Sequence, residues 1–333
     1  MSYFIEVGNG EAVPSAEIPQ LSFSDFRSEI LYTVSNGGKI VQYFAYPDGG
    51  KLKLLAVLRS DQQLLAGGCN VPPTYPSLTP NCEPLHLFER EIAEQYGIRP
   101  VGHPWLKMVR YHPNYSAGED VFGNNYDEDI PGNYKYYSVE GEEIHEVAVG
   151  PVHAGVIEPG HFRFNCIGER VLNLEIQLGY QHRGIERMLP EVAPKRYPII
   201  AEGIAGDTAI GHSLCMAQAF EGLSGKKPDP GAKIIRTMAL EIERLQNHVG
   251  DLGALSADVA FLPPANYFGR MRGDFLNMSL WICGNRFGKG TLRAGGVRFP
   301  MTDEDREVLE GRIEELHPQV EHVIQLLFST SSV

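Results

Sequence analysis

Long stretches of helical periodicity in the second half of the chain limit its fold more than any other feature. Apolar residues recur there at i, i+3, i+4 and i+7, the spacing that gives a helix a buried face. The sequence predicts helices over Leu172–Leu189, Ile199–Leu223, Ala232–Leu255 and Tyr267–Phe287. Because each of them has an apolar stripe to bury, the second half is expected to be a helical bundle.

One more helix is predicted near the end of the chain. Thr302 and Asp305 have the spacing of a capping box, and an apolar stripe follows from Leu309 to Leu327. Pro318 is expected to kink or split this helix. The sequence stops six residues after Leu327 although the stripe needs a partner, so we expect an incomplete, C-terminally truncated bundle. The alternative is that the helix docks on its own bundle.

The first half has mixed α and β signals. Lys39–Ser60 alternates apolar and polar residues around Asp48-Gly49-Gly50, which predicts a β-hairpin. Phe88–Tyr96 predicts a short amphipathic helix that ends at Gly97. We therefore expect an α+β fold with three parts: an α/β module over 1–113, an acidic linker rich in Gly and Tyr over 114–145, and the helical domain over 146–333.

The charge and the apolar runs limit the partners of the chain. Its 333 residues have a formal net charge of −13, which repels nucleic-acid phosphates and anionic membrane surfaces, so we expect no nucleic-acid partner. No apolar run reaches the roughly 18 to 20 residues of a membrane-spanning helix, so no direct membrane insertion is expected. Met1–Glu11 does not resemble a secretory signal, which favours the cytoplasm. The five cysteines contain no Cys-x-x-Cys pair and are expected to be reduced, mostly buried thiols.

Polar residues inside the helical segments are the candidates for chemistry, because burying them is costly unless they are paired or used. They are His182, Arg183, Asp207, His212, Glu241, Glu243, Arg244, His248, Asp251, Asp258, Arg286 and Arg293. Glu241, Arg244 and His248 lie on successive turns of one predicted helix and are expected to form a buried polar ladder.

Several motifs, in order along the chain, carry a family resemblance. Gly150-Pro151-Val152-His153, Gly160-His161-Phe162-Arg163 and the segment 179–186 resemble the large subunit of formate hydrogenlyase-type (group 4, membrane-associated) nickel-iron hydrogenases. They also resemble the homologous quinone-pocket subunit of respiratory complex I, the NADH:quinone oxidoreductase. Gly284-Asn285-Arg286 and the segment 293–297 continue this order.

The N-terminal half resembles a second complex I subunit. Phe88-Glu89-Arg90-Glu91, Tyr96-Gly97-Ile98 and Gly102-His103-Pro104 are similar to the small peripheral-arm subunit. In formate hydrogenlyase this module is fused ahead of the large subunit. The resemblance therefore covers both halves and implies a hydrogenase-type helical domain behind a peripheral-arm module.

The resemblance also indicates what the chain lacks. Ala205 and Thr208 stand where hydrogenases place the Cys-x-x-Cys that binds nickel, so no metal site and no cofactor of its own are expected. Gly206 falls at the position of the tyrosine that holds the quinone head group in complex I. Gly206, Asp207 and Thr208 are therefore expected to form a degenerate metal or quinone pocket, in which a quinone is the one possible ligand.

Other site residues are implied by the same resemblance. His153, His161 and Asp258 are expected to form a proton-handling pocket, because a carboxylate beside an imidazole brings its pKa into the physiological range. The alternative is that the two histidines cap turns. His182 and Arg183 are expected to face the 4Fe-4S cluster of a neighbouring subunit without ligating it; a surface ion pair of Arg183 with Glu186 or Glu175 is the alternative.

The implied function is that of an electron-transfer subunit in a complex I-like or formate hydrogenlyase-like oxidoreductase. Its expected partners are an iron-sulfur small subunit and membrane-arm subunits, which would hold it peripherally on the cytoplasmic, inner face of the membrane. The complex would couple redox to proton movement, and the isolated chain is expected to be inactive. A redox-silent scaffold subunit is the alternative, and a nickel-iron hydrogenase large subunit is a third possibility.

Overall fold

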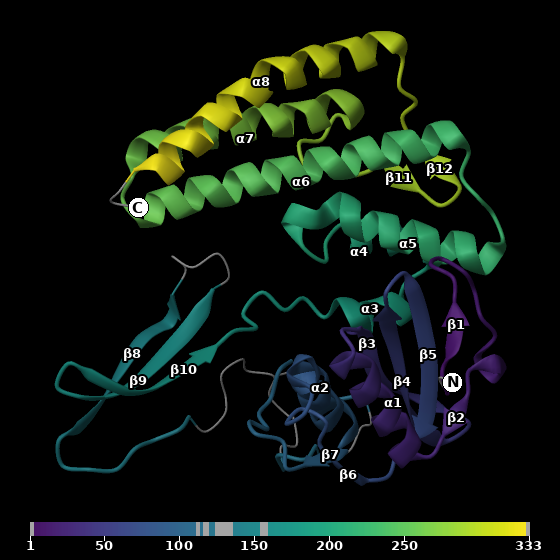
Figure 1. Cartoon of the computed structure of the whole chain (residues 1–333), viewed down its shortest axis with the longest axis vertical. Helices are drawn as coiled ribbons and strands as arrows, with labels where there is room; N and C mark the ends of the chain where they lie inside the picture. The colour runs from purple at the N-terminus through teal and green to yellow at the C-terminus, as the bar shows by residue number, and fades with distance from the viewer. Residues whose placement is uncertain (1–2, 111–113, 116–119, 124–135, 154–158, 331–333) are drawn as a thin grey trace. The chain divides into compact units, whose positions relative to one another are not determined.

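The computed structural model describes residues 3–110, 114–115, 120–123, 136–153 and 159–330 (Figure 1). The chain forms two compact units. The first consists of Met1–Asn9 and Val13–Arg183, and the second of Gly10–Ala12 and Gly184–Val333. Each unit is described by itself below.

The first unit is built on a sheet of five strands in the order β1-β5-β4-β3, with β2 added to β5 in parallel. Its other pairings are antiparallel. The strands are β1 (Ile5–Val7), β2 (Gln20–Leu21), β3 (Lys39–Asp48), β4 (Lys51–Ser60) and β5 (Gln63–Asn70). The hairpin predicted around Asp48-Gly49-Gly50 is confirmed: both glycines have the positive φ that such a tight turn requires.

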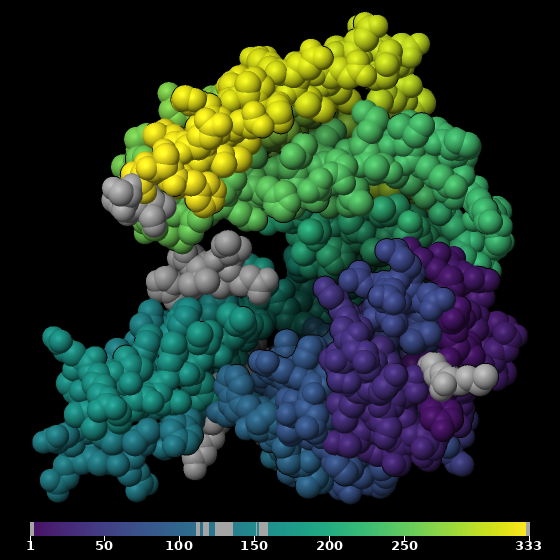
Figure 2. All heavy atoms as spheres, viewed as in Figure 1, coloured from purple at the N-terminus to yellow at the C-terminus, as the bar shows by residue number. Residues whose placement is uncertain are grey.

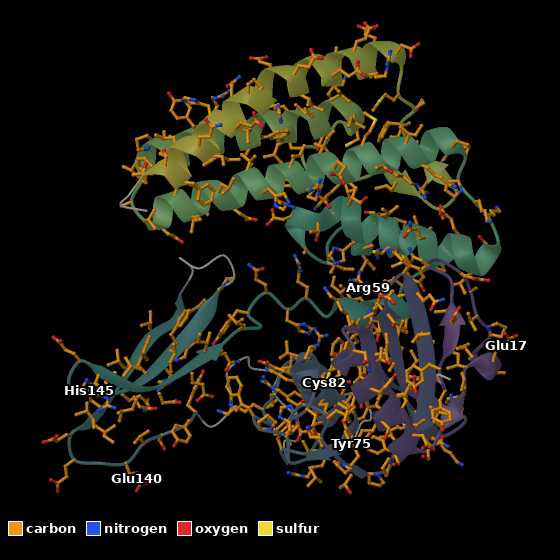
Figure 3. The ribbon with its side chains drawn as sticks, in the orientation of Figure 1. Glu17, Arg59, Tyr75, Cys82, Glu140 and His145 are labelled. Carbon is orange, nitrogen blue, oxygen red and sulfur yellow. The ribbon has the colours of Figure 1, made fainter. Side chains whose placement is uncertain are left out.

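Two helices pack on this sheet through one apolar core. Helix α1 (Phe23–Ser35) begins at Ser22, whose side chain accepts a hydrogen bond from the amide of Asp25. It contributes Phe26 and Ile30 to the core, α2 (His86–Tyr96) contributes Ile92, and the sheet contributes Tyr43, Leu54 and Leu58. Tyr75 and Cys82 are buried in the same core (Figure 3). Helix α2 ends, as predicted, at Gly97 in the left-handed conformation.

Buried carboxylates of α2 fix the irregular backbone around it. Glu89 is fully buried and accepts hydrogen bonds from the amides of Leu78 and Thr79 and from the hydroxyls of Ser77 and Thr79. Glu94, also fully buried, accepts from the amides of Val109 and Arg110. Glu89 belongs to the motif Phe88-Glu89-Arg90-Glu91 that carries the family resemblance. In this structure it binds the backbone and hydroxyl groups of the preceding loop. A short parallel pair, β6 (Thr74–Pro76) and β7 (Arg99–Val101), lies in this region.

The remaining strands of the first unit form an antiparallel sheet in the order β10-β9-β8. They are β8 (Ile144–His153), β9 (Gly160–Ile167) and β10 (Arg170–Gln177). One face is apolar, with Val147, Phe164 and Leu174 in one cross-strand row. The other face is polar, and its buried Glu175 forms an ion pair with Lys107 and accepts from the amide of Tyr137.

This sheet corrects the predicted helix over Leu172–Leu189. Residues 170–177 are strand β10, and a helix, α3 (Ile185–Glu191), begins only after an irregular segment. The predicted helical domain over 146–333 therefore begins with β-structure. Half of the predicted linker over 114–145 lies outside the described residues.

The second unit is helical. After α3 come α4 (Tyr197–Ala201), α5 (Ala209–Ser224), α6 (Pro230–Asp258), α7 (Leu262–Cys283) and α8 (Asp303–Ser329). The predicted helices Ala232–Leu255 and Tyr267–Phe287 correspond to α6 and α7, and Ile199–Leu223 is divided between α4 and α5. Helices α6, α7 and α8 share one core, which includes Ile242, Phe268, Met271 and Leu316. Figure 2 shows α7 and α8, in green and yellow, packed along their length.

Helix α8 confirms one local prediction and corrects part of another. The capping box is present: the hydroxyl of Thr302 accepts from the amide of Asp305, and the Asp305 carboxylate accepts from the amide of Thr302. Pro318 does not split the helix, which runs on to Ser329. Its apolar stripe is buried in the core shared with α7 and α6 through Leu309, Leu316 and Val323, so the helix docks on its own bundle.

Three of the five cysteines, Cys69, Cys82 and Cys166, are buried, and none of the five forms a disulfide. Burial raises the pKa of the Cys69 thiol to about 12, which makes it unreactive. Within the described residues, no helix has both the length and the hydropathy needed to span a bilayer.

Candidate functional site

The start of helix α5 gathers polar side chains from three helices. A 3-10 turn, Gly206–Thr208, precedes the helix. Thr208 is the N-cap residue, but its side chain does not cap a backbone amide. Instead, the Thr208 hydroxyl lies 2.8 Å from Nδ1 of His212 one turn later. The same His212 Nδ1 is 3.0 Å from the carbonyl oxygen of Thr208. Thr208 and His212 are therefore bound to each other.

A carboxylate from α6 satisfies the free amides at this helix end. Glu243 is 4 % exposed, and its two oxygens accept from the amides of Ile210 at 2.6 Å and Gly211 at 2.9 Å. Helix N-termini favour negative charge because their first amides are unpaired and the helix dipole is positive there. Glu243 thus occupies the position that an anionic ligand would otherwise take.

Burial governs the protonation of Glu243. Its pKa is raised from the usual glutamate value because the carboxylate is removed from water, and Asp207 nearby acts in the same direction. The amides of Ile210 and Gly211 and the neighbouring His212 act in the opposite direction, although desolvation is the larger effect.

Asp207 links the turn to two further helices. Its carbonyl oxygen accepts a hydrogen bond of 2.7 Å from Asn247 of α6, and its carboxylate lies 3.3 Å from the Arg272 guanidinium of α7. Gly250 leaves room for this arginine: a Cβ at Gly250 would lie 2.9 Å from Nε of Arg272. Both charged groups of the pair are partly exposed, so the ion pair itself stabilises the fold only slightly.

The donor atoms of this cluster do not fit a nickel-iron centre, which requires soft thiolates. Ala205 has no ligating atom, and the Thr208 oxygen is already bound to His212. Within the described part of the chain, no three His, Cys, Asp or Glu side chains are grouped so as to hold a metal ion. Gly206 has no side chain, and open space surrounds the position of its missing Cβ.

The predicted proton-handling residues are divided between the two units. His161 of β9 is 6 % exposed, and its Nε2 accepts a hydrogen bond of 3.3 Å from Nε of Arg163. His153 ends β8, and its side chain is outside what the structure describes. Asp258 is an exposed residue at the end of α6, in the second unit, so its pairing with a histidine stays a prediction.

His182 and Arg183 lie on the segment between β10 and α3, and both are exposed. The amide of His182 closes a turn on the carbonyl oxygen of Gly179 at 3.0 Å. Glu175, one of the two surface partners considered for Arg183, is buried and forms an ion pair with Lys107. Exposure leaves both side chains accessible to another subunit.

The predicted polar ladder on α6 is wrong. Glu241 and Arg244 form an ion pair exposed to solvent, and His248 is exposed. The buried polar residues of the helix are Arg236, Glu243, Gln246 and Ser256. Their positions fall on the same stripe as the buried Ala239 and Val249, and that register is the signal in the sequence that could have found them.

Comparisons with known proteins agree with this structure. Residues 32–119 match the model of the family described as the respiratory-chain NADH dehydrogenase 30 Kd subunit. This part of the chain is therefore similar to that family. The resemblance predicted from the N-terminal motifs is therefore confirmed.

The curated relatives confirm the resemblance over most of the chain. Hydrogenase-4 component G of Escherichia coli is 26% identical over 268 residues, which cover 78% of this chain and 48% of that protein. Formate hydrogenlyase subunit 5 of the same organism is 26% identical over 271 residues and has the same coverages. The C/D polypeptide of the NADH-quinone oxidoreductase of Bacteroides thetaiotaomicron is 26% identical over 250 residues, covering 68% of this chain and 47% of that protein. The chain spans about half the length of these relatives.

A solved structure shares the fold. A chain from the structure of the membrane-bound sulfane sulfur reductase, an archaeal respiratory membrane complex, matches with a TM-score of 0.51 and 21% identity. The match covers 59% of this chain and 52% of that one. The relatives are thus subunits of hydrogenase-like and complex I-like oxidoreductases.

Proposed function

We propose that this chain is an electron-transfer subunit of a complex I-like or formate hydrogenlyase-like oxidoreductase at the membrane. In this proposal it sits against an iron-sulfur small subunit, contacts membrane-arm subunits and helps couple cluster reduction to proton movement. It has no nickel-iron centre of its own and is inactive when isolated. The relatives' names support the type of complex, and the match over both halves of the chain supports the role of a subunit.

The residues at the start of α5 support the proposal that this chain, unlike a hydrogenase large subunit, has no nickel-iron centre. The resemblance places the family's nickel-binding cysteines at Ala205 and Thr208. Thr208 is engaged by His212, and Glu243 neutralises the helix end, so the cluster is self-sufficient without a metal. Stoichiometric nickel in the purified complex would contradict this argument.

Arg183 gives a sharper test of the iron-sulfur contact. A cation beside a cluster stabilises its reduced, more negative form, so the Arg183→Gln variant of the whole complex should have a lower midpoint potential at that cluster. An EPR-monitored redox titration measures this shift. Arg187→Gln on the exposed face of α3 is the matched control and should leave the potential unchanged. Equal potentials in wild type and the Arg183 variant would contradict the contact.

A redox-silent scaffold is the second candidate function. It is favoured by Gly206, which offers neither a hydroxyl nor a ring to a quinone, and by the paired state of Thr208. Replacing His153, His161 or Asp258 by Ala in the whole complex separates the two functions. A proton-handling subunit should lose turnover with its assembly intact, whereas a scaffold should keep its turnover.

A further inference from the structure

The connection between α7 and α8 has a charge opposite to that of the rest of the chain. We call residues 284–302 the basic loop. It contains Arg286, Lys289, Arg293 and Arg298 and no acidic residue. Because the loop carries +4 and the whole chain −13, the rest of the chain carries −17. A cationic segment in such a chain calls for an explanation.

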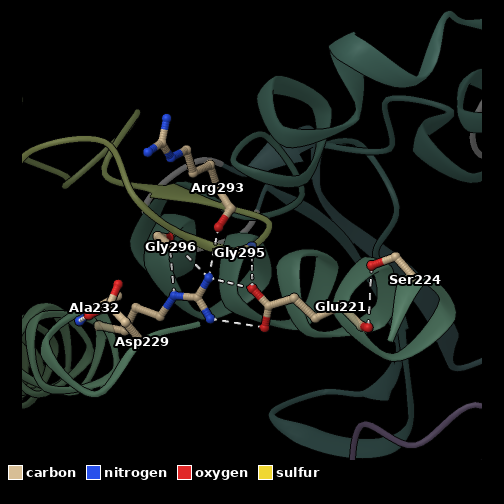
Figure 4. Close-up of polar contacts among 8 residues, drawn as sticks. Glu221, Ser224, Asp229, Ala232, Arg293, Gly295 and Gly296 are labelled. Atoms are coloured by element: carbon tan, nitrogen blue, oxygen red, sulfur yellow. Dashed lines mark hydrogen bonds and ion pairs between the residues drawn. The ribbon is translucent and has the colours of Figure 1, made fainter. Parts of the chain in front are cut away.

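A buried ion pair holds the backbone of this loop. Arg236 of α6 donates to the carbonyl oxygens of Arg293 at 2.7 Å and Gly296 at 2.9 Å. Its partner Glu221 of α5 accepts from the amide of Gly295 at 2.6 Å. Strands β11 (Leu292–Arg293) and β12 (Gly296–Val297) pair on either side of these contacts. Figure 4 shows the ion pair below the loop, with the guanidinium of Arg293 pointing away from it.

A second buried carboxylate fixes the first part of the loop. Glu202, 8 % exposed, accepts a hydrogen bond of 2.7 Å from the amide of Gly290. Next to it, the side chain of Asn285 accepts from the amide of Phe287, and the hydroxyl of Thr291 donates to the carbonyl of Gly288. The loop is therefore ordered by contacts that use its backbone and its uncharged side chains.

The four cationic side chains take no part in that framework. All four are exposed. Arg298 stacks on Phe299, and none of the four forms an ion pair with an acidic residue in the described part of the chain. The protein thus presents four cations from a backbone that is already ordered, so little conformational entropy of the loop is lost when a partner binds.

We propose that the basic loop is a docking surface for a carboxylate-rich segment of a protein partner. Three of its four cations are arginines, whose planar guanidinium groups match carboxylates in a two-pronged geometry. The inference relies on the proposed function only in taking the chain to be a subunit of a larger complex.

The charge of the remaining chain favours a protein partner over other anions. At physiological salt the Debye length is about 8 Å. A narrow acidic segment can therefore contact the loop while salt screens most of its repulsion by the −17 charge of the rest of the chain. An extended anionic membrane or a nucleic acid would meet the negative surface as well. Membrane-surface binding also needs several apolar side chains to insert, whereas in the loop Phe287 is exposed but Leu292 is buried.

The first test uses the full chain with two probes, a fluorescent glutamate decapeptide and vesicles of phosphatidylcholine and phosphatidylglycerol. The R286Q/R293Q/R298Q variant should bind the peptide about tenfold more weakly than wild type, since each exposed contact contributes about 0.5 kcal/mol. K226Q/K227Q/K233Q removes the same charge from exposed lysines of the same unit and should change affinity less than about twofold. Equal losses in both variants, or binding to vesicles but not to peptide, would overturn the proposal.

The second test needs no variant and uses the native complex. Zero-length carbodiimide coupling should join Lys289 to an Asp or Glu of a copurifying subunit, and acetylation of Lys289 should be slower in the complex than in the isolated chain. Lys226 and Lys227 serve as controls. Equal acetylation in both states without a cross-link would overturn the proposal. Neither test reads redox activity, so a redox-inactive complex would contradict the proposed function alone.

Discussion

Arg236 and Glu221 face each other as a two-pronged ion pair between α6 and α5. Nη2 of Arg236 lies 2.6 Å from Oε1 of Glu221, and Nη1 lies 3.1 Å from Oε2. The side chains are 4% and 8% exposed. Both side chains also bind the backbone of the connection between α7 and α8: Arg236 donates to the carbonyl oxygen of Gly296, and Glu221 accepts from the amide of Gly295. The ion pair therefore holds this connection against the bundle.

Removing one charge of this pair should destabilise the second unit strongly. Glu221→Gln leaves the Arg236 guanidinium buried without its counter-charge, which costs about 3–5 kcal/mol of unfolding free energy. Urea unfolding followed by circular dichroism measures the loss. Glu241→Gln, which breaks the exposed pair with Arg244, should cost less than about 1 kcal/mol. Equal costs for the two variants would contradict the assigned role.

The same pair predicts a pH dependence. The hydrogen bonds and charge of Arg236 lower the pKa of Glu221 from its usual 4.5. Since the unfolded chain takes up the proton at the higher pH, this stabilisation is fully present above pH 4.5 and declines as the pH falls through the lowered folded value. The difference in unfolding free energy between wild type and Glu221→Gln should therefore decrease below pH 4.5. A difference that increases as the pH falls would contradict this prediction.

Local signals in the sequence were sufficient to predict the structural features that depend on only a few adjacent residues. The turn at Asp48-Gly49-Gly50, the end of α2 at Gly97 and the capping box at Thr302 each depend on chemistry within one turn. The prediction of a helix over Leu172–Leu189 was wrong because Leu172 and Ile176 also fit a helical i, i+4 spacing. The alternation of apolar residues with Asn173, Glu175 and Gln177 is the strand signal, and pairing with β9 decides between them.

The candidate site could be predicted only in part for a similar reason. Asp207 and Thr208 were marked by their place in a family motif. Their environment depends on Glu243, 33 residues beyond Ile210, and on Arg272, 65 residues beyond Asp207. A helical stripe shows that Glu243 faces the core, but only the packing of α5 on α6 shows that it meets a helix end.

Glu243→Gln should reveal the role of that carboxylate. The amide group of glutamine directs an N–H donor at the amide of Ile210 or Gly211, so we expect a loss of about 1–3 kcal/mol at pH 5 to 6. Burial raises the pKa of Glu243, so the folded state holds its proton to higher pH than the unfolded chain. Wild-type stability relative to the variant should thus fall as the pH rises from the usual glutamate value toward the raised one. A difference independent of pH would contradict the raised pKa.

Two glycines of the second unit should respond differently to the same substitution. Gly206→Ala should change the unfolding free energy by less than about 0.5 kcal/mol, because nothing lies within 4 Å of the new Cβ. Gly288→Ala should cost about 1–3 kcal/mol, because φ is +69° and the new Cβ would lie 2.6 Å from Ile210. Thermal or urea unfolding of the two variants provides the comparison. A larger cost at Gly206 would show that the turn before α5 is more tightly packed than described.

Glu89 should be the most sensitive carboxylate of the first unit. It is fully buried, and all of its described partners, the amides of Leu78 and Thr79 and the hydroxyls of Ser77 and Thr79, lie within one short segment. Glu89→Gln replaces one accepting oxygen by a donor that faces these donors, and we expect a loss of at least about 3 kcal/mol. Glu83→Gln, on the exposed turn before α2, should cost less than about 0.5 kcal/mol. Hydrogen exchange adds a local readout, since the amides of Leu78 and Thr79 should lose protection in the first variant and keep it in the second. Retained protection in Glu89→Gln would mean that this segment is ordered without the carboxylate.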